Sequence, residues 1–184
     1  LVPTADGKGV VALMRSRTLK VCRSVSTDGG RTFPPCEEIE LANPSAGIDA
    51  VRTRAGQLVL IYNPTAVART PISLAVSADD GRTWRKVRDL ETEPGEYSYP
   101  AMIENAAGQL EIVYTWRRTH IKHVRVEAAA PGEWRFPAGD AALFSSPVGR
   151  FRAVALAEGV SALLLFFVAM PIKYVSALGG DPRP

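Results

Sequence analysis

The chain has 184 residues, and 46% of them are hydrophobic, so it can bury a sizeable core. Its 15 glycines and 14 prolines suit a turn-rich β protein. The formal net charge is only +3, and the basic residues are dispersed along the chain without forming a block, which argues against a nucleic-acid partner.

Three stretches within residues 1–127 repeat one arrangement. Each has an apolar run, a turn that contains a glycine (Gly7, Gly56 or Gly108) and a second strand. A third strand follows in each stretch, as LKVCRSVS, PISLAVS and HIKHVRVE, and a fourth closes the first two units. A period of about 50 residues with four short strands per unit is typical of a β-propeller blade. The sequence therefore predicts an all-β fold.

An eight-residue string closes the third strand of the first two units. STDGGRTF at residues 26–33 and SADDGRTW at residues 77–84 both match Ser-x-Asp-x-Gly-x-Thr-aromatic. Asp28 and Asp79 can each accept hydrogen bonds from backbone N–H groups across a turn, and Gly30 and Gly81 can take a positive φ. Threonine and the aromatic residue then begin the returning strand. Each string therefore predicts a tight hairpin.

This string is the Asp-box, and two copies at this spacing resemble the blades of the sialidase family of β-propellers. In that family the box is structural and lies away from the active site. The resemblance covers residues 1–127 and implies a partial propeller, about three four-stranded blades of a sialidase-type propeller with about six. It also implies that the N-terminal half of the propeller is missing from this chain.

Two cysteines, Cys22 and Cys36, flank the first Asp-box almost symmetrically. They could face each other across its hairpin and form a disulfide. A pair of buried free thiols fits the same positions, so the sequence leaves both states open.

The resemblance implies three catalytic residues. Sialidases grip the substrate carboxylate with three arginines, because a guanidinium group pairs with a carboxylate through two parallel hydrogen bonds. Arg15, at the end of a second strand, resembles the second of these arginines, and Arg69, ahead of the second Asp-box, resembles the third. Tyr97 follows Arg69 at the family's spacing, is followed by Ser98, and matches the nucleophilic tyrosine.

The chemistry of the substrate explains a tyrosine nucleophile. Sialic acid carries a carboxylate beside its anomeric carbon, which repels an anionic nucleophile and favours a neutral phenol. A phenol has an unperturbed pKa of about 10, so it needs a carboxylate base to attack at neutral pH, and the product retains its configuration. The resemblance places this base, the acid and the first arginine at or before Leu1. The chain alone is therefore expected to be inactive.

Three further residues are expected to bind substrate. Asp49 starts the inner strand of the second unit and could point into a central pocket. Tyr99 lies two residues after Tyr97, on the same side of a regular strand, and is the alternative pocket residue. Arg117 and its neighbour Arg118 belong to a short basic cluster, which is either a solvated rim or an anion-binding rim.

No metal site or cofactor is expected. His120 and His123 in HIKH have the look of metal ligands, but residues three apart on a strand face opposite sides, and no third ligand is nearby. The expected function is that of a retaining exo-α-sialidase type of glycoside hydrolase, and its partner is a sialylated or other acidic glycan. The alternatives are a noncatalytic glycan-binding propeller and a small membrane protein fused to a propeller remnant.

The composition changes after Glu127. Residues 128–149 are rich in proline, glycine and alanine, and they read as a linker. The apolar stretch that begins at Ala153 and ends at Met170 is broken only by Glu158 and has the threshold length for a membrane span. It resembles the first transmembrane helix of an uncharacterised family of small bacterial membrane proteins.

A transmembrane segment is therefore expected at residues 150–175, and with it an association with the membrane. The alternative for this segment is a buried final strand and helix that close the propeller.

Overall fold

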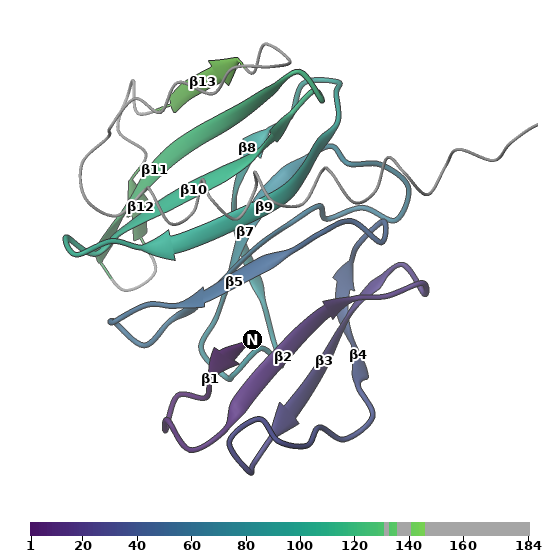
Figure 1. Cartoon of the computed structure of the whole chain (residues 1–184), viewed down its shortest axis with the longest axis vertical. Coiled ribbons are helices and arrows are strands. Elements are labelled where there is room, and N and C mark those ends of the chain that lie inside the picture. Colours follow the sequence, from purple (N-terminus) through teal and green to yellow (C-terminus); the bar gives the residue numbers. More distant parts are fainter. Residues whose placement is uncertain (131–132, 136–140, 146–184) are drawn as a thin grey trace, which may run out of the picture. The chain divides into compact units, whose positions relative to one another are not determined.

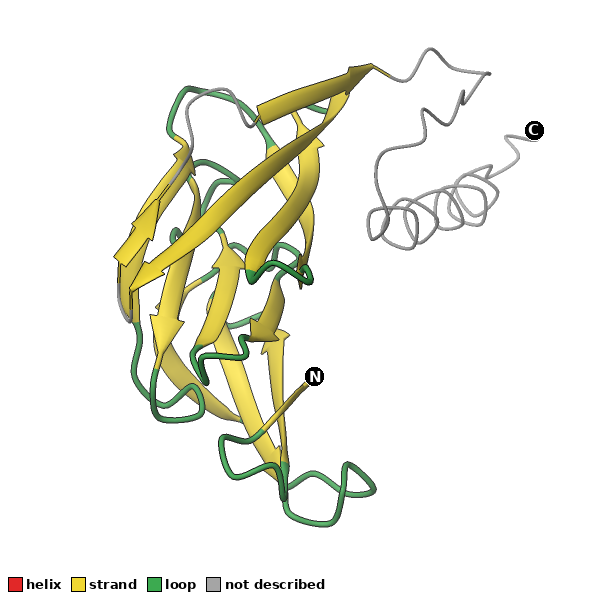
Figure 2. Ribbon diagram, turned by 90° about the vertical axis from the view of Figure 1, so that its left-hand side faces the viewer, coloured by secondary structure: helices red, strands yellow, loops and turns green. Residues whose placement is uncertain are grey.

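A computed structural model of the chain describes residues 1–130, 133–135 and 141–145. Every element in this part of the chain is a β-strand, and the strands form three antiparallel sheets (Figures 1 and 2). The expected all-β fold is confirmed for these residues. All described residues belong to one compact unit of the chain, Leu1–Gly149.

The first sheet has the strand order β1-β2-β3-β4. Val11 and Leu13 of β2 pack against residues of the second sheet, whereas Met14 is 38% exposed, as alternation along a strand predicts. The strands of this first sheet are β1 (Val2–Pro3), β2 (Val10–Arg15), β3 (Lys20–Ser26) and β4 (Glu37–Ala42).

The second sheet has the order β5-β6-β7-β8. Every residue of β6 and β7 is buried, so both faces of these two strands are covered. This explains why β6, LVLIY, is a continuous apolar run. In β7 the run is interrupted by Ser73 and Ser77, whose buried hydroxyl groups donate to Asp89 and Asp79. The strands are β5 (Asp49–Arg52), β6 (Leu58–Tyr62), β7 (Ile72–Ser77) and β8 (Arg85–Glu91).

The third sheet has the order β12-β11-β10-β9, and β13 also pairs with β11. The pairing of β9 with β10 shifts register between Val113 and Thr115. The strands are β9 (Tyr97–Glu104), β10 (Gln109–Trp116), β11 (His120–Ala130), β12 (Glu133–Arg135) and β13 (Ala141–Ser145). The end of β11, with β12 and β13, falls within residues 128–149, so part of the stretch that reads as a linker contributes strands.

The segment expected to cross a membrane, residues 150–175, lies outside the described residues. Within the described ranges, no helix has the length and apolar character needed for a membrane span.

Apolar contacts join neighbouring sheets. Val11 and Leu13 of the first sheet share a cluster with Leu58 of the second. A larger cluster joins the second sheet to the third through Ile61, Leu74, Met102, Ile112 and Tyr114, all of them buried. The three sheets thus follow one another in chain order, each packed on the next (Figure 1).

The two repeated strings form the same turn, between β3 and β4 and between β7 and β8. In the second turn, Asp79 Oδ1 accepts the backbone N–H groups of Arg82 (3.1 Å) and Thr83 (2.9 Å), and Oδ2 accepts the Thr83 hydroxyl (2.6 Å). Asp28 makes the matching bonds in the first turn. Burial alone raises the pKa of Asp79, but the hydrogen bonds from Thr83, Ser77 and Arg82 outweigh it and lower the pKa to about 2.

One of the differences between the two turns changes their contacts: Gly29 in the first corresponds to Asp80 in the second. Both have a positive φ, 76° and 57°. The Asp80 carboxylate accepts the backbone N–H of Ala5 at 2.9 Å and pairs with Arg52, while its carbonyl accepts Arg23 Nε at 2.7 Å. Asp80 therefore ties the first sheet to the second, and these bonds hold a residue with a side chain in a conformation that favours glycine.

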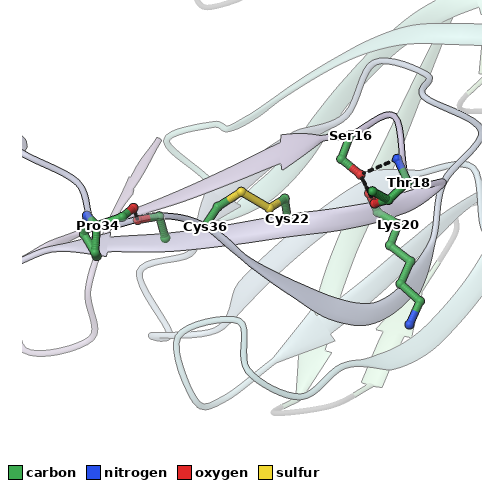
Figure 3. The surroundings of a disulfide bond; sticks show 7 residues. Ser16, Thr18, Lys20, Cys22, Pro34 and Cys36 are labelled. Carbon is green, nitrogen blue, oxygen red and sulfur yellow. Dashed lines mark hydrogen bonds between the residues drawn. A yellow bond between two sulfur atoms is a disulfide. The ribbon is translucent and has the colours of Figure 1, made fainter.

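Cys22 and Cys36 form a disulfide (Figure 3). Cys22 lies in β3 and Cys36 directly precedes β4, and their Cα atoms are 5.7 Å apart. The Ser24 hydroxyl donates to the Pro34 carbonyl at 2.7 Å in the same loop. The disulfide thus closes the loop that contains the first repeated turn.

Candidate functional site

The candidate site residues gather at one end of the sheets. Because the strands are antiparallel, the ends of β2, β4, β6, β8 and β10 share this end with the starts of β3, β5, β7, β9 and β11. The repeated turns, after β3 and β7, lie at the opposite end. The six candidates are at the end of β2 (Arg15), at the start of β5 (Asp49), between β6 and β7 (Arg69), at the start of β9 (Tyr97, Tyr99) and after β10 (Arg117).

Hydrogen bonds between connections hold Arg69 and Tyr97 together. The backbone N–H of Tyr97 donates to the carbonyl of Arg69 at 3.0 Å. The buried side-chain amide of Asn63 donates to the carbonyls of Tyr97 (3.2 Å) and Pro71 (2.8 Å). The third sheet is thereby fastened to the connection between β6 and β7 at this end.

An ion-pair cluster surrounds Glu96, the residue before Tyr97. Arg69 Nη1 lies 2.9 Å from Glu96 Oε1, and Arg118 Nε lies 2.6 Å from Glu96 Oε2. Burial alone raises the pKa of Glu96, but the hydrogen bond from Arg118 and the charges of both arginines outweigh it and lower the pKa. Glu96 is therefore a carboxylate at neutral pH and links arginines from two connections.

The hydroxyl of Tyr97 is enclosed. The residue is fully buried, and its hydroxyl donates to the carbonyl of Glu93 at 3.0 Å. Arg117 Nε approaches the same oxygen at 3.4 Å. A Cβ atom added to Gly95 would lie 3.0 Å from this hydroxyl oxygen, so a side chain here would require the tyrosine to shift by a few tenths of an ångström. A substrate can reach the hydroxyl only after these covering groups move.

Tyr99 has the opposite environment and is 50% exposed. The Arg69 guanidinium carbon lies 5.3 Å from the centre of its ring, which is cation–π distance. Regular alternation predicts Tyr97 and Tyr99 on one face. Their environments differ because the register shift between β9 and β10 and a positive φ of 50° at Tyr99 interrupt the regular strand here.

Arg117 lies beside Tyr97 and is exposed. Its guanidinium carbon is 4.6 Å from the centre of the Trp116 ring, and its backbone N–H donates to the Glu96 carbonyl at 2.8 Å. A positive φ at both Arg117 and Arg118 makes the tight turn that brings the two guanidinium groups back over the start of β9.

Asp49 and Arg15 have local partners. Asp49 Oδ2 accepts the backbone N–H of Met102 at 2.7 Å, which joins β5 to β9. Burial raises the pKa of Asp49, and the hydrogen bonds from Met102 and Ala50 only partly offset the effect. Arg15 donates from Nη1 to the carbonyl of Ser45 at 3.3 Å, in the connection that leads to Asp49. The hydrogen bonds of Asp49 and Arg15 therefore do not join either residue to the ion-pair cluster around Glu96.

Glu96 was missed at the sequence level, although it lies within GEYSYPAM beside Tyr97. Its pairing with Arg69 depends on how two connections meet, and no local pattern encodes that meeting. His123 Nε2 lies 2.6 Å from Glu111 Oε2, and Arg125 Nε donates to Glu111 Oε1 at 2.9 Å. In the described part of the chain, no three residues of the metal-binding types lie together as a candidate metal site.

A cavity of about 610 Å³ lies at the other end, beside the repeated turns. Arg23, Glu37, Asp80 and Arg82 are among the residues that line it. It is therefore separate from the cluster around Glu96.

Comparisons with known proteins agree with this architecture. The sequence pattern of the BNR repeat-like domain family matches residues 1–112. No curated protein matches the chain.

Three similar solved structures illustrate the likeness in fold. The NanB sialidase of Streptococcus pneumoniae is 16% identical, with a TM-score of 0.56 over 76% of this chain and 22% of its own. The intramolecular trans-sialidase of Ruminococcus gnavus is 15% identical, with a TM-score of 0.53 over 78% and 31%. A putative exo-β-1,3-galactanase of Bifidobacterium bifidum is 14% identical, with a TM-score of 0.51 over 73% and 49%. The chain thus spans less than half of each of these proteins.

Proposed function

Because the chain belongs to the BNR repeat-like domain family, we propose that it forms part of a sialidase-like glycoside hydrolase that acts on a sialylated or other acidic glycan. In this proposal the three sheets are successive blades of a propeller, and the two repeated turns are its Asp-boxes. Two of the solved structures with a similar fold are a sialidase and a trans-sialidase.

The observation that carries the proposal is the cluster of arginines beside two tyrosines. Arg69, Arg117 and Arg118 bring three positive charges to the start of β9, and Glu96 offsets one of them. Guanidinium groups suit the carboxylate of a sugar acid because they combine charge with paired N–H donors. An excess of positive charge at this end favours an anionic sugar over a neutral one.

The proposed chemistry assigns a role to each residue. Arg69, with Arg15, holds the substrate carboxylate. The Tyr97 oxygen attacks the anomeric carbon while the glycosidic bond breaks and the acid, which the rest of the protein supplies, protonates the departing oxygen; water then hydrolyses the glycosyl–tyrosine intermediate. The Arg117 guanidinium beside the Tyr97 oxygen stabilises the phenolate that develops when a base removes its proton. Tyr99, Arg117 and Asp49 are the proposed substrate-binding residues. The segment around Gly95 must move before the attack.

A second candidate function is glycan binding without hydrolysis. The enclosed hydroxyl of Tyr97 favours it, since a binding module needs no reactive phenol. Tyr99 would then provide an exposed aromatic face beside Arg69 for the sugar.

Titration of the full chain with N-acetylneuraminic acid and with its methyl ester, followed by NMR, tests both functions. We expect the acid to bind more tightly than the neutral ester, and we expect Arg69→Ala to abolish this preference. Arg82→Ala is the matched control, because Arg82 is exposed and lies in a repeated turn at the opposite end. Equal binding of acid and ester, or an unchanged preference in Arg69→Ala, would contradict an acid-specific site.

Turnover of a fluorogenic sialoside separates the hydrolase from the binding module. The chain alone should not turn the sialoside over. A protein that combines it with residues for the base and the acid should do so if the hydrolase proposal is right, and should only bind the sugar if the binding proposal is right.

A further inference from the structure

Three connections meet at one carboxylate in the candidate site. Glu96 lies between β8 and β9, Arg69 between β6 and β7, and Arg118 in the turn between β10 and β11. The two arginines thus come from neighbouring sheets. Glu96 is the group that joins them, because each of its oxygens contacts a different guanidinium.

The contacts occupy only one nitrogen of each guanidinium. Glu96 uses Nη1 of Arg69 (2.9 Å) and Nε of Arg118 (2.6 Å). A guanidinium has five N–H donors. No acceptor other than Glu96 contacts either guanidinium among the described residues, so the remaining N–H groups are left to meet a ligand.

The two arginines depend on Glu96 to different degrees. Arg69 is 26% exposed in its side chain and also lies over the Tyr99 ring, so two contacts orient it. The Arg118 side chain is 70% exposed, and Glu96 is its ion-pair partner among the residues that the structure describes. A long, exposed side chain loses rotamer freedom when it binds a ligand, and a partner that already orders it removes part of this cost.

We propose that Glu96 is a positioning residue that holds the guanidinium groups of Arg69 and Arg118 in place for one carboxylate of a sugar acid. This inference rests on the proposed function, in which Arg69 and Arg15 hold the substrate carboxylate, and it adds Arg118 to the groups that hold it. With Arg117, the cluster has three guanidinium groups; Glu96 offsets one of their charges, and the charges of Glu93 and Glu91 act on Arg117. Such a cluster suits a monoanionic sugar acid.

The rival role for Glu96 is that of a competitor, which occupies the guanidinium groups that a ligand would otherwise use. The two roles predict opposite effects of removing its charge. A positioning residue strengthens ligand binding, so its loss weakens binding although the net positive charge of the site rises. The loss of a competitor strengthens binding.

The first test compares Glu96→Gln with Glu93→Gln in the full chain. Both variants remove one negative charge from the connection between β8 and β9. The charge of Glu93 acts on Arg117, but neither Arg69 nor Arg118 is paired with its carboxylate, and the hydrogen bond that the structure gives for Glu93 uses its backbone carbonyl. Titration with N-acetylneuraminic acid is expected to show binding weakened roughly tenfold in Glu96→Gln and changed less than about twofold in Glu93→Gln. Binding of the acid by Glu96→Gln as tight as in the unmodified chain, or tighter, would overturn the proposal.

The second test needs no sugar. In the unmodified chain, the Arg118 Nε–H resonance should be dispersed and protected from exchange with water, because Glu96 holds it. In Glu96→Gln it should move to the position of a free arginine, whereas Glu93→Gln should leave it in place. An unchanged resonance in Glu96→Gln refutes the positioning role. If the resonance moves as expected but the unmodified chain binds neither acid nor ester, the proposed function fails while the ordering of Arg118 by Glu96 stands.

Discussion

Removing the disulfide should destabilise the fold by changing the unfolded state. Cys22 and Cys36 are 14 positions apart, so the bond closes a loop of about 15 residues, and loop-closure entropy for that length corresponds to about 3 kcal/mol at 25 °C. The double substitution Cys22→Ala with Cys36→Ser removes this constraint. Cys22 is 5% exposed, so the loss of its buried sulfur adds up to about 1 kcal/mol. The expected loss in the free energy of unfolding is therefore about 3 to 4 kcal/mol.

The folded state should change little in this variant. Ser24 still donates to the Pro34 carbonyl, and Arg23 still pairs with Glu37, so noncovalent contacts keep the loop against β3. The matched control is Ser24→Ala, which removes a single hydrogen bond from the same loop and should cost about 1 kcal/mol.

Urea unfolding of the full chain measures the effect. With a slope of about 2 kcal/mol per molar urea, the midpoint should fall by about 1.5 to 2 M in the double variant. The unmodified chain in the presence of a reductant should behave in the same way. A double variant whose unfolding free energy lies within about 1 kcal/mol of the unmodified chain would refute the reasoning, because loop closure would then not constrain the unfolded state as the chain-entropy treatment requires.

Three further predictions concern the turns and the site. The pKa of Asp79, about 2, lies below its unfolded value of about 3.9, so its contribution to stability is complete above about pH 4 and is lost as the pH falls towards 2. Urea unfolding at several pH values should therefore show Asp79→Asn destabilised at pH 6, with the difference shrinking towards pH 2; a constant difference would contradict this. Asp80→Gly relieves a positive φ, worth about 1 kcal/mol, but it removes bonds to Arg52 and a backbone N–H, so a net loss of about 1 to 2 kcal/mol is expected in the same assay. A gain in stability would show that the tie between the sheets is weak. In a protein that supplies the base and the acid, Tyr97→Phe should lower sialoside turnover by orders of magnitude and Tyr99→Phe far less, and the reverse order would move the nucleophile to Tyr99.

The repeated units could be predicted from the sequence because their determinants are local. Alternating or continuous apolar runs define the strands, and the aspartate of each string provides the acceptors that its turn uses, as the bonds of Asp28 and Asp79 show. The positions of Arg69 and Tyr97 in the sequence were enough to predict that both lie at the same end of the sheets, since the direction of each strand determines which strand ends meet.

Other features depend on how separate segments meet, and sequence patterns do not encode this. The burial of Tyr97 results from the path of the chain at Gly95 and from the register shift in the third sheet. The ion pairs of Glu96 join connections from two sheets. The pairing of Cys22 with Cys36 stayed open because two thiols and a disulfide suit the same strand positions until the distance between them is known.

The two ends of the repeated units obey different constraints. At the turn end, the units use the same aspartate to satisfy the same backbone groups, so a change there costs stability in either copy. At the opposite end, the equivalent positions around the end of the second strand hold Arg15, Asn63 and Thr115, three different side chains. Duplication of a unit therefore copies the scaffold but not the chemistry. Each new copy offers a separate position where a side chain can be exchanged without disturbing the turn that holds its strands together.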